Sequence, residues 1–223
     1  VKFSFTGGEP TIYKDYLPFI QSSGGGITVS GGEALLQMPF LIELFKACRE
    51  AQRIEHVVLG TECGLLDQMA MMFSKPNHAT LIDFSTNTTT HHHLPESHIF
   101  KLIDSKIHRT LGEIDYQNSV DERIKNKHVK EENQRVKEAI RASPEQLGLL
   151  LNASHESLRT IGVSLEEIDQ QVNILQNTPG VWGARMMGGG FGGMILVLVE
   201  HKDILPQGVV AQPSEAGFVQ EFL

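Results

Sequence analysis

Cysteine is scarce in this chain of 223 residues, with only Cys48 and Cys63. Two thiols cannot build a disulfide framework or a four-thiolate metal site, so we expect a reducing, cytoplasmic setting. Cationic side chains are also few, with 19 Lys and Arg against 27 Asp and Glu and a net charge of −8. This deficit argues against a nucleic-acid partner, because such a partner requires clustered cations.

Long apolar runs and an N-terminal export signal are missing as well. No stretch approaches the roughly 18 consecutive apolar residues of a membrane-spanning helix, and the first residues lack the charged-then-apolar pattern of a signal peptide. We therefore expect neither a membrane span nor secretion. The 40% of apolar residues is enough to bury a core in one large domain or two small ones.

Glycine, by contrast, is concentrated in residues 185–193, which read Arg-Met-Met-Gly-Gly-Gly-Phe-Gly-Gly. The run joins two expected strands, residues 181–184 and 194–199. Glycine allows positive φ and lets a ligand lie directly against the main chain. We interpret the run as the wall of a ligand pocket, and a tight hairpin between two core strands is the alternative.

Helical signals dominate the second half of the chain. Ser-x-x-Glu/Gln spacings beginning at Ser119, Ser143 and Ser164 predict three helix starts. The last helix carries apolar residues at spacings of three, four and three: Leu165, Ile168, Val172 and Leu175. With further short strands expected at residues 79–84 and 99–104, the pattern favours helices packed on a small antiparallel sheet, an α+β fold.

Residues 63–68 read Cys-Gly-Leu-Leu-Asp-Gln and lead into an apolar segment, residues 65–73, that we expect to form a buried helix. Asp67 would lie near the start of that helix, where the helix dipole favours a negative charge. We take it as the candidate catalytic group, expect it to be buried, and expect it to share a cleft with the glycine run. A simple helix cap is the alternative role.

Histidine is clustered at residues 91–93, with His98 nearby. Imidazoles are common metal ligands. Adjacent residues on a loop point in different directions, however, and no Asp or Cys accompanies them at a ligand spacing. We therefore expect a solvated polar loop over residues 85–97 rather than a metal site.

Four phrases in this order resemble the galactokinases, sugar kinases of the GHMP superfamily, over residues 55–214. They are the 63–68 phrase, the Asp-Ser pair at 104–105 followed by Tyr116, residues 151–159 (Leu-Asn-Ala-Ser-His-Glu-Ser-Leu-Arg), and residues 180–193. The resemblance implies a GHMP-kinase-like α+β fold and ATP-dependent phosphorylation of the C1 hydroxyl of galactose with Mg²⁺. The 63–68 phrase favours galactose over mevalonate or homoserine, the substrates of other superfamily members.

The resemblance also implies roles for individual residues. Asp67 would act as base or electrostatic anchor beside the C1 hydroxyl, Tyr116 would contact the sugar, and Gly189 and Gly190 would line the pocket. His155 would brace helices. Residues 24–33 stand where the family has its phosphate loop, and their candidate nucleotide ligands are Gly25, Gly26, Thr28 and Ser30, with Ser30 also a candidate magnesium ligand.

The N-terminal part departs from that family. Its Gly-Arg-x-Asn motif has no counterpart here, so we expect impaired activity. Residues 14–52 instead resemble pyruvate formate-lyase activating enzymes of the radical S-adenosylmethionine class, although two cysteines cannot hold their iron–sulfur cluster. We expect a glycine-rich, radical-enzyme-like segment over residues 1–53, the rest of a GHMP N-terminal domain over 54–94, and a ferredoxin-like C-terminal sandwich over 95–223.

Two alternative functions remain from the sequence. One is a noncatalytic homologue of galactokinase that senses a sugar or a nucleotide. The other is a fragment of a radical S-adenosylmethionine activating enzyme. The sequence does not indicate an oligomeric state.

Overall fold

The computed structural model describes residues 46, 48–50, 52–54, 57, 64–86, 88–107, 121–188 and 190–214. They form two compact units, which divide in sequence between Leu94 and Pro95. One unit contains the described residues up to Leu94 together with residues 213 and 214, and the other contains residues 95–212. Most of the predicted segment 1–53 lies outside the described residues. None of the helices in the described part of the chain is long and apolar enough to cross a membrane.

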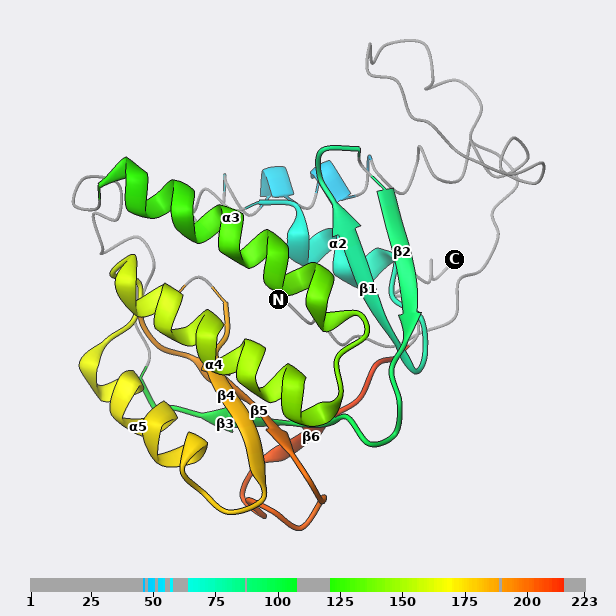
Figure 1. The fold of residues 1–223 in the computed structure, drawn as a ribbon. Helices are drawn as coiled ribbons and strands as arrows, with labels where there is room; N and C mark the ends of the chain where they lie inside the picture. Colours follow the sequence, from blue (N-terminus) through cyan, green and yellow to red (C-terminus); the bar gives the residue numbers. More distant parts are fainter. Residues whose placement is uncertain are drawn as a thin grey trace, which may run out of the picture. The chain divides into compact units, whose positions relative to one another are not determined.

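The smaller unit contains helix α2 and a β-hairpin, and residues 46, 48–50, 52–54 and 57 before them are also helical (Figure 1). Helix α2 spans Leu66–Met72, and strands β1 (His78–Asp83) and β2 (Thr88–His93) pair in antiparallel fashion, with His78 opposite His93. The predicted helix 65–73 and strand 79–84 are confirmed. The predicted loop 85–97 is wrong, because β-branched threonines favour an extended backbone and pair residues 88–93 with β1.

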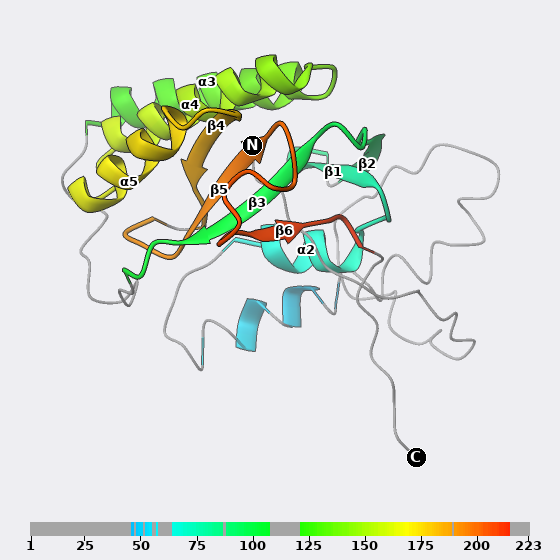
Figure 2. The same cartoon turned by 90° about the horizontal axis from the view of Figure 1, so that it is seen from below.

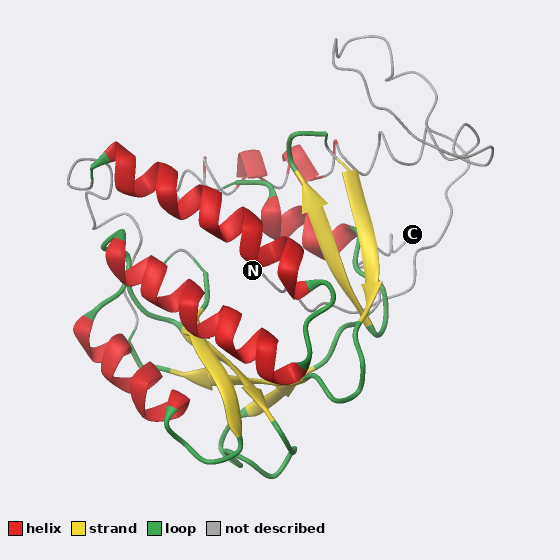
Figure 3. Cartoon of the chain, in the orientation of Figure 1, coloured by secondary structure: helices red, strands yellow, loops and turns green. Residues whose placement is uncertain are grey.

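The larger unit is an α+β arrangement, as predicted. Its elements are β3 (Ile99–Asp104), α3 (Glu122–Ala139), α4 (Pro144–Thr160), α5 (Glu166–Gln176), β4 (Val181–Met186), β5 (Met194–Val199) and β6 (Val209–Ala211). The strands form one sheet in the order β4-β5-β3-β6, and every pairing is antiparallel (Figure 3). The three strands predicted in this region are therefore confirmed.

The start of α4 is a capping box, as its sequence predicted. The Ser143 hydroxyl accepts a hydrogen bond from the Gln146 backbone N–H, and the Gln146 side chain accepts one from the Ser143 backbone N–H. Pro144 stands in the first turn, where its missing N–H costs no helical hydrogen bond. Local sequence is therefore enough to fix where this helix begins.

The other two predicted caps are wrong. Helix α3 begins after Asp121 instead of Ser119, and the Asp121 carboxylate accepts a hydrogen bond from the Arg123 backbone N–H. Helix α5 begins after Leu165 without a side-chain cap. The Ser164 hydroxyl instead donates to the Asp169 carboxylate at 2.6 Å, because that acceptor lies within reach on the first turns of α5.

The core of the larger unit joins α5 to the sheet. The apolar stripe of α5 is buried as predicted, at Ile168, Val172 and Leu175. It packs against alternate residues of two strands and against the segment before α5: Ala184, Met186, Ile195, Val197, Val199, Ile161 and Val163. On the other face of β5, Leu196 and Leu198 are buried as well. This burial on both faces explains why β5 is apolar without alternation.

Helix α4 approaches β4 so closely that only glycine fits at the contact (Figure 2). A Cβ on Gly148 would lie 2.2 Å from the Trp182 carbonyl oxygen, and a Cβ on Gly183 would lie 2.2 Å from the Gly148 carbonyl oxygen. Gly183 contacts α4, whereas the next residue, Ala184, belongs to the cluster around α5. The two helices therefore hold β4 from two sides.

Side chains of these helices also satisfy the outer edge of β4. The Ala184 backbone N–H donates to the Asn152 side-chain oxygen at 2.9 Å, and the Ala184 carbonyl accepts from the Gln176 amide at 2.9 Å. Edge strands otherwise leave such groups open. Asn152 comes from α4 and Gln176 from α5, so the strand that leads into the glycine run is fixed by both helices.

Candidate active site

The glycine run forms an irregular connection between β4 and β5. The Met187 backbone N–H donates to the Met194 carbonyl at 2.9 Å and closes its base. Five described residues of the connection have positive φ: Gly188, Gly190, Phe191, Gly192 and Gly193. Such a path is accessible to glycine and strained for most other residues. The observed φ values thus account for the glycine content, and a regular two-residue hairpin does not.

The connection, residues 187–193, is anchored on two sides by backbone hydrogen bonds. The Phe191 N–H donates to the Val163 carbonyl and the Gly193 N–H to the Ile107 carbonyl, both at 2.9 Å. A Cβ on Gly190 would lie 2.5 Å from the Val163 oxygen, and one on Gly192 would lie 2.3 Å from the Ile107 oxygen. Close backbone approach therefore requires glycine at both positions. We call the described residues of this connection, 187, 188 and 190–193, the glycine wall.

Ser105, in the Asp-Ser phrase after β3, is the second anchor of this wall. Its side chain is buried, and its backbone N–H donates to the Gly193 carbonyl at 3.0 Å. Its carbonyl accepts from the Gln171 amide of α5, and its hydroxyl accepts from the Ile107 N–H. No role for Ser105 was predicted; the signals in the sequence were its place after a predicted strand and its place in the Asp-Ser pair of the galactokinase-like phrase.

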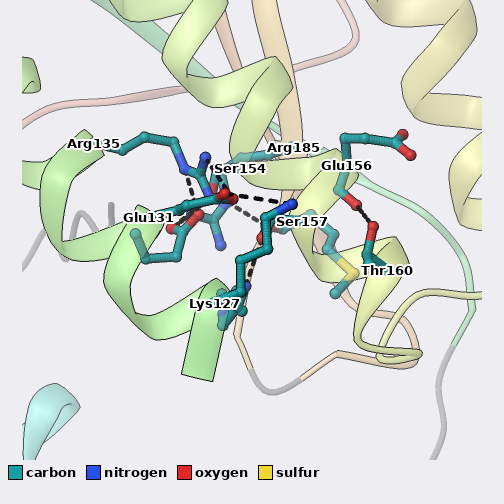
Figure 4. Close-up of polar contacts among 11 residues, drawn as sticks. Lys127, Glu131, Arg135, Ser154, Glu156, Ser157, Thr160 and Arg185 are labelled. Atoms are coloured by element: carbon teal, nitrogen blue, oxygen red, sulfur yellow. Dashed lines mark hydrogen bonds and ion pairs between the residues drawn. The ribbon is translucent and has the colours of Figure 1, made fainter. Parts of the chain in front are cut away.

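Arg185, just before the glycine run, lies at the centre of a buried polar network (Figure 4). It is 5% exposed. One guanidinium nitrogen donates to the Ser154 hydroxyl at 2.7 Å and lies 3.9 Å from the Glu132 carboxylate, while Nε donates to the Met186 carbonyl. Ser154 in turn donates to Glu132 at 2.8 Å. A directed chain of hydrogen bonds thus ties β4 to α4 and α3.

The charge on Glu132 is stabilised within this network. Burial by itself raises the pKa of the carboxyl, but nearby positive charge and the hydrogen bonds from Ser154 and Arg135 outweigh it and lower the pKa to about 2. Arg135 donates to Glu132 at 2.7 Å. Burial lowers the pKa of Arg185, which nevertheless stays protonated because an arginine pKa starts so high. Both partners are therefore ionised at neutral pH.

Residues 151–159 lie in α4, and their polar side chains contact several other elements. Besides Asn152 and Ser154, its Ser157 hydroxyl is 2.8 Å from Nδ1 of His128 on α3. His155 is buried, and its Nε2 lies 3.3 Å from an Asp169 oxygen on α5. Burial, together with nearby arginines, lowers the pKa of His155, so it is neutral at physiological pH. Its position between two helices agrees with the bracing role expected for it.

Asp67 is the second residue of α2. It is exposed, whereas Gln68, Met69 and Ala70 after it are buried. The prediction of a buried acid is therefore wrong: the helix turns its following residues inward and leaves this carboxylate at the surface. The cap residue Leu65 makes no side-chain hydrogen bond to the helix. Asp67 is the acidic residue of the first turn of α2.

The remaining predicted site residues are Gly25, Gly26, Thr28, Ser30, Tyr116 and Gly189, and all lie outside the described residues. Asp67 and Gly190 belong to different units, so their convergence on one cleft stays a prediction. Among the described residues, no three His, Cys, Asp or Glu side chains lie together so as to hold a metal ion. The structure thus brings together the glycine wall and its supports, and the sugar and phosphate ligands remain predicted.

Comparison with known proteins agrees with this fold. Residues 136–207 match the family model described as GHMP kinases C terminal. The chain is 35% identical to the galactokinase of Thermotoga maritima over 193 residues, which cover 70% of this chain and 54% of that protein. The chain thus spans about half the length of the curated relatives it matches.

Solved structures show the same fold at lower identity. A structure of Lactococcus lactis galactokinase complexed with galactose aligns with a TM-score of 0.65 and 22% identity, covering 82% of this chain and 63% of that one. The mevalonate kinase of Methanococcus jannaschii aligns with a TM-score of 0.55 and 19% identity over 74% of this chain and 52% of that one.

The fold is therefore α+β and GHMP-kinase-like, as the sequence predicted, with a GHMP-kinase C-terminal domain in the larger unit. Among members of this superfamily, the chain is similar to galactokinases. These matches give no support to the resemblance of residues 14–52 to radical S-adenosylmethionine enzymes. They also give no support to the expectation of impaired activity.

Proposed function

We propose that this chain belongs to a galactokinase-like sugar kinase that transfers the terminal phosphoryl group of ATP to the C1 hydroxyl of galactose. The observation that carries the proposal is the glycine wall at residues 187–193, held by backbone hydrogen bonds to Val163 and Ile107 in a chain 35% identical to a galactokinase. Preorganised backbone of this kind suits a site that must position a sugar without moving itself.

The proposed reaction is a direct phosphoryl transfer. The C1 oxygen of galactose forms a bond to the terminal phosphorus of ATP, and the bond from that phosphorus to the bridging oxygen of ADP breaks. The exposed Asp67 carboxylate would orient the C1 hydroxyl or accept its proton. Tyr116, Gly189 and Gly190 would contact the sugar. Positioning and electrostatics supply most of the catalysis in such transfers.

The nucleotide and its metal are assigned to other predicted residues. Gly25, Gly26, Thr28 and Ser30 would bind the ATP phosphates through backbone N–H groups and hydroxyls. Ser30 would also bind Mg²⁺, which neutralises phosphate charge when bound. No cluster of His, Cys, Asp or Glu among the described residues competes for this role. A cytoplasmic location belongs to the same proposal.

Replacing Asp67 by Asn tests the proposal in a coupled assay of galactose-dependent ADP release. We expect the rate to fall about 10²–10³-fold, the usual cost of removing one transition-state-stabilising group. Asp203→Asn, which changes another exposed aspartate in the larger unit, should leave the rate unchanged. Equal rates for Asp67→Asn and the parent chain would refute the assignment of Asp67.

Calorimetric titration with galactose separates the kinase from a noncatalytic sensor. The kinase proposal expects both sugar binding and turnover in the parent chain. Galactose binding without any phosphate transfer would instead support the sensor, and absence of both would remove galactose as the ligand.

A further inference from the structure

The short connection between α4 and α5 holds one side of the glycine wall (Figure 1). Its Val163 carbonyl accepts the hydrogen bond from the Phe191 N–H at 2.9 Å, and a Cβ on Gly190 would lie 2.5 Å from the same oxygen. That oxygen belongs to the peptide group that joins Val163 to Ser164. Because a peptide group is planar, the direction of this carbonyl depends on how Ser164 is held.

A carboxylate on α5 holds Ser164. The Ser164 hydroxyl donates to Oδ1 of Asp169 at 2.6 Å. The other oxygen of Asp169, Oδ2, accepts from Nε of Arg159 on α4 at 2.9 Å. Hydrogen bonds to an ionised acceptor are roughly twice as strong as those between neutral groups. Asp169 therefore ties together α4, α5 and the connection between them.

The surroundings of Asp169 favour the bond to Ser164. The Asp169 side chain is 23% exposed, and the buried His155 lies 3.3 Å from Oδ1. Limited contact with water strengthens a hydrogen bond. The pair of Arg159 with Glu156 is different, because these side chains are 47% and 64% exposed, and exposed ion pairs contribute little.

We propose that Asp169 is a positioning residue for galactose: its bond to Ser164 fixes the direction of the Val163 carbonyl and so the place of the glycine wall. The inference rests on the proposed function, in which Gly190 contacts the sugar. Asp169 acts through the connection and takes no part in the phosphoryl transfer. Removing its bond should loosen the side of the wall that Val163 anchors and leave the other side in place.

Amide hydrogen exchange followed by NMR tests this positioning. Ser164→Ala and Asp169→Ala should each speed exchange of the Phe191 amide at least about tenfold, because a hydrogen bond to a charged acceptor is lost. The Gly193 amide, which bonds to Ile107 on the other side of the wall, should keep its rate. The double variant should exchange no faster than Asp169→Ala, because both changes remove the same bond.

Glu156→Gln is the matched control. Glu156 also accepts a hydrogen bond from Arg159, at 2.6 Å, but it is exposed and lies on α4 before the connection. This variant should leave the exchange of the Phe191 amide unchanged.

Steady-state kinetics test the consequence for the sugar. Ser164→Ala and Asp169→Ala should raise the KM for galactose about tenfold and leave kcat and the KM for ATP unchanged, because only sugar binding is weakened. Glu156→Gln should leave all three constants unchanged.

An unchanged Phe191 amide in both variants, or equal acceleration of the Phe191 and Gly193 amides, would overturn the positioning role. Faster exchange of the Phe191 amide with an unchanged KM for galactose would overturn its connection to the sugar. Lack of turnover in the parent chain would instead refute the proposed function, and the exchange rates would still decide whether Asp169 places the glycine wall.

Discussion

The two units of this chain treat their polar side chains in opposite ways. In the larger unit, Arg185 and Glu132 are held in a hydrogen-bonded network and little exposed. In the smaller unit, the side chains of Asp67 and His93 are exposed. The contrast separates groups that hold the fold together from groups left able to meet a ligand. Matched substitutions in the two units test this division.

The largest effect is expected from Arg185→Met. Removing the guanidinium takes away the hydrogen bonds to the Ser154 hydroxyl and the Met186 carbonyl and a positive charge 3.9 Å from Glu132, while Arg135 stays bonded to Glu132. Because each buried polar group that loses its hydrogen bond costs about 1–3 kcal/mol, we expect the free energy of unfolding to fall by about 3 kcal/mol. Urea unfolding followed by fluorescence of Trp182, the single tryptophan, reports on this unit directly because Trp182 lies in β4. Asp67→Asn in the smaller unit should leave that transition unchanged. Similar urea midpoints for Arg185→Met and Asp67→Asn would contradict the division between the two units.

Acid should destabilise the larger unit through Glu132. Because the folded pKa of this carboxyl is lowered to about 2, its contribution is complete above its ordinary pKa near 4.5 and is lost as the pH falls from about 5 toward 2. At most the loss is about 3 kcal/mol. Glu132→Gln should flatten this part of the stability profile, measured by urea titrations at successive pH values. An unchanged profile would contradict the assignment.

Asp83 supplies the comparison in the smaller unit. Hydrogen bonds from Ser85 lower its pKa as well, but the carboxyl is fully exposed. Asp83→Asn should therefore leave the acid limb of the Trp182 transition in place. If Asp83→Asn flattened it as much as Glu132→Gln does, burial would not be the deciding factor.

A smaller loss is expected for Gly148→Ala, roughly 1–3 kcal/mol from overpacking, although alanine is the better helix former. The added methyl group would meet the Trp182 backbone, which cannot move without shifting β4. Gly64→Ala is the control, because nothing lies within 4 Å of its Cβ position. Gly148→Ala should lower the urea midpoint while Gly64→Ala leaves it in place; the reverse order would show that α4 and β4 do not touch here.

The smallest effect belongs to Ser143→Ala, which removes the capping box of α4 and should cost about 1 kcal/mol. Thr90→Ala, on the exposed face of the hairpin, should change the unfolding free energy by less than about 0.5 kcal/mol. Both are measured by the same urea titration. A Ser143→Ala variant as stable as the parent would mean that α4 is fixed by its packing alone.

Much of the fold was predictable because its signals are local. The α5 stripe and the unbroken apolar run of β5 each report burial through their periodicity. Ser143 and Gln146 mark a helix start through contacts three residues apart. The same reasoning was wrong at the other two helices. Asp121 instead of Ser119 caps α3, and the Ser164 hydroxyl donates a hydrogen bond to Asp169.

The histidine hairpin shows a different kind of error. The polar character of residues 91–93 predicts a loop, but the threonines before them favour an extended backbone and β1 provides the partner strand. Asp67 was expected to be buried because its neighbours are apolar, yet the helix phase places it outward. In both cases the residue types of the segment did not reveal its backbone conformation or which side chains face outward.

The contacts that hold β4 against α3 and α4 were beyond local reasoning. Arg185 meets Glu132 across 53 positions of sequence, and Gly148 meets Gly183 across 35. Nothing in the residues around either glycine distinguishes a packing contact from a turn. Such pairs depend on how helices and strands cross, which is settled only by the assembled fold.

The amide caps on Ala184 also close part of the outer edge of β4. In the folded chain, a further strand cannot pair with β4 through Ala184, because Asn152 and Gln176 already occupy the backbone groups of Ala184 that such a strand would need. Within the described sheet the opposite margin is β6, only three residues long, with Val209 and Val210 exposed. A further strand would therefore pair more readily at β6, and Val209→Lys should suppress such pairing.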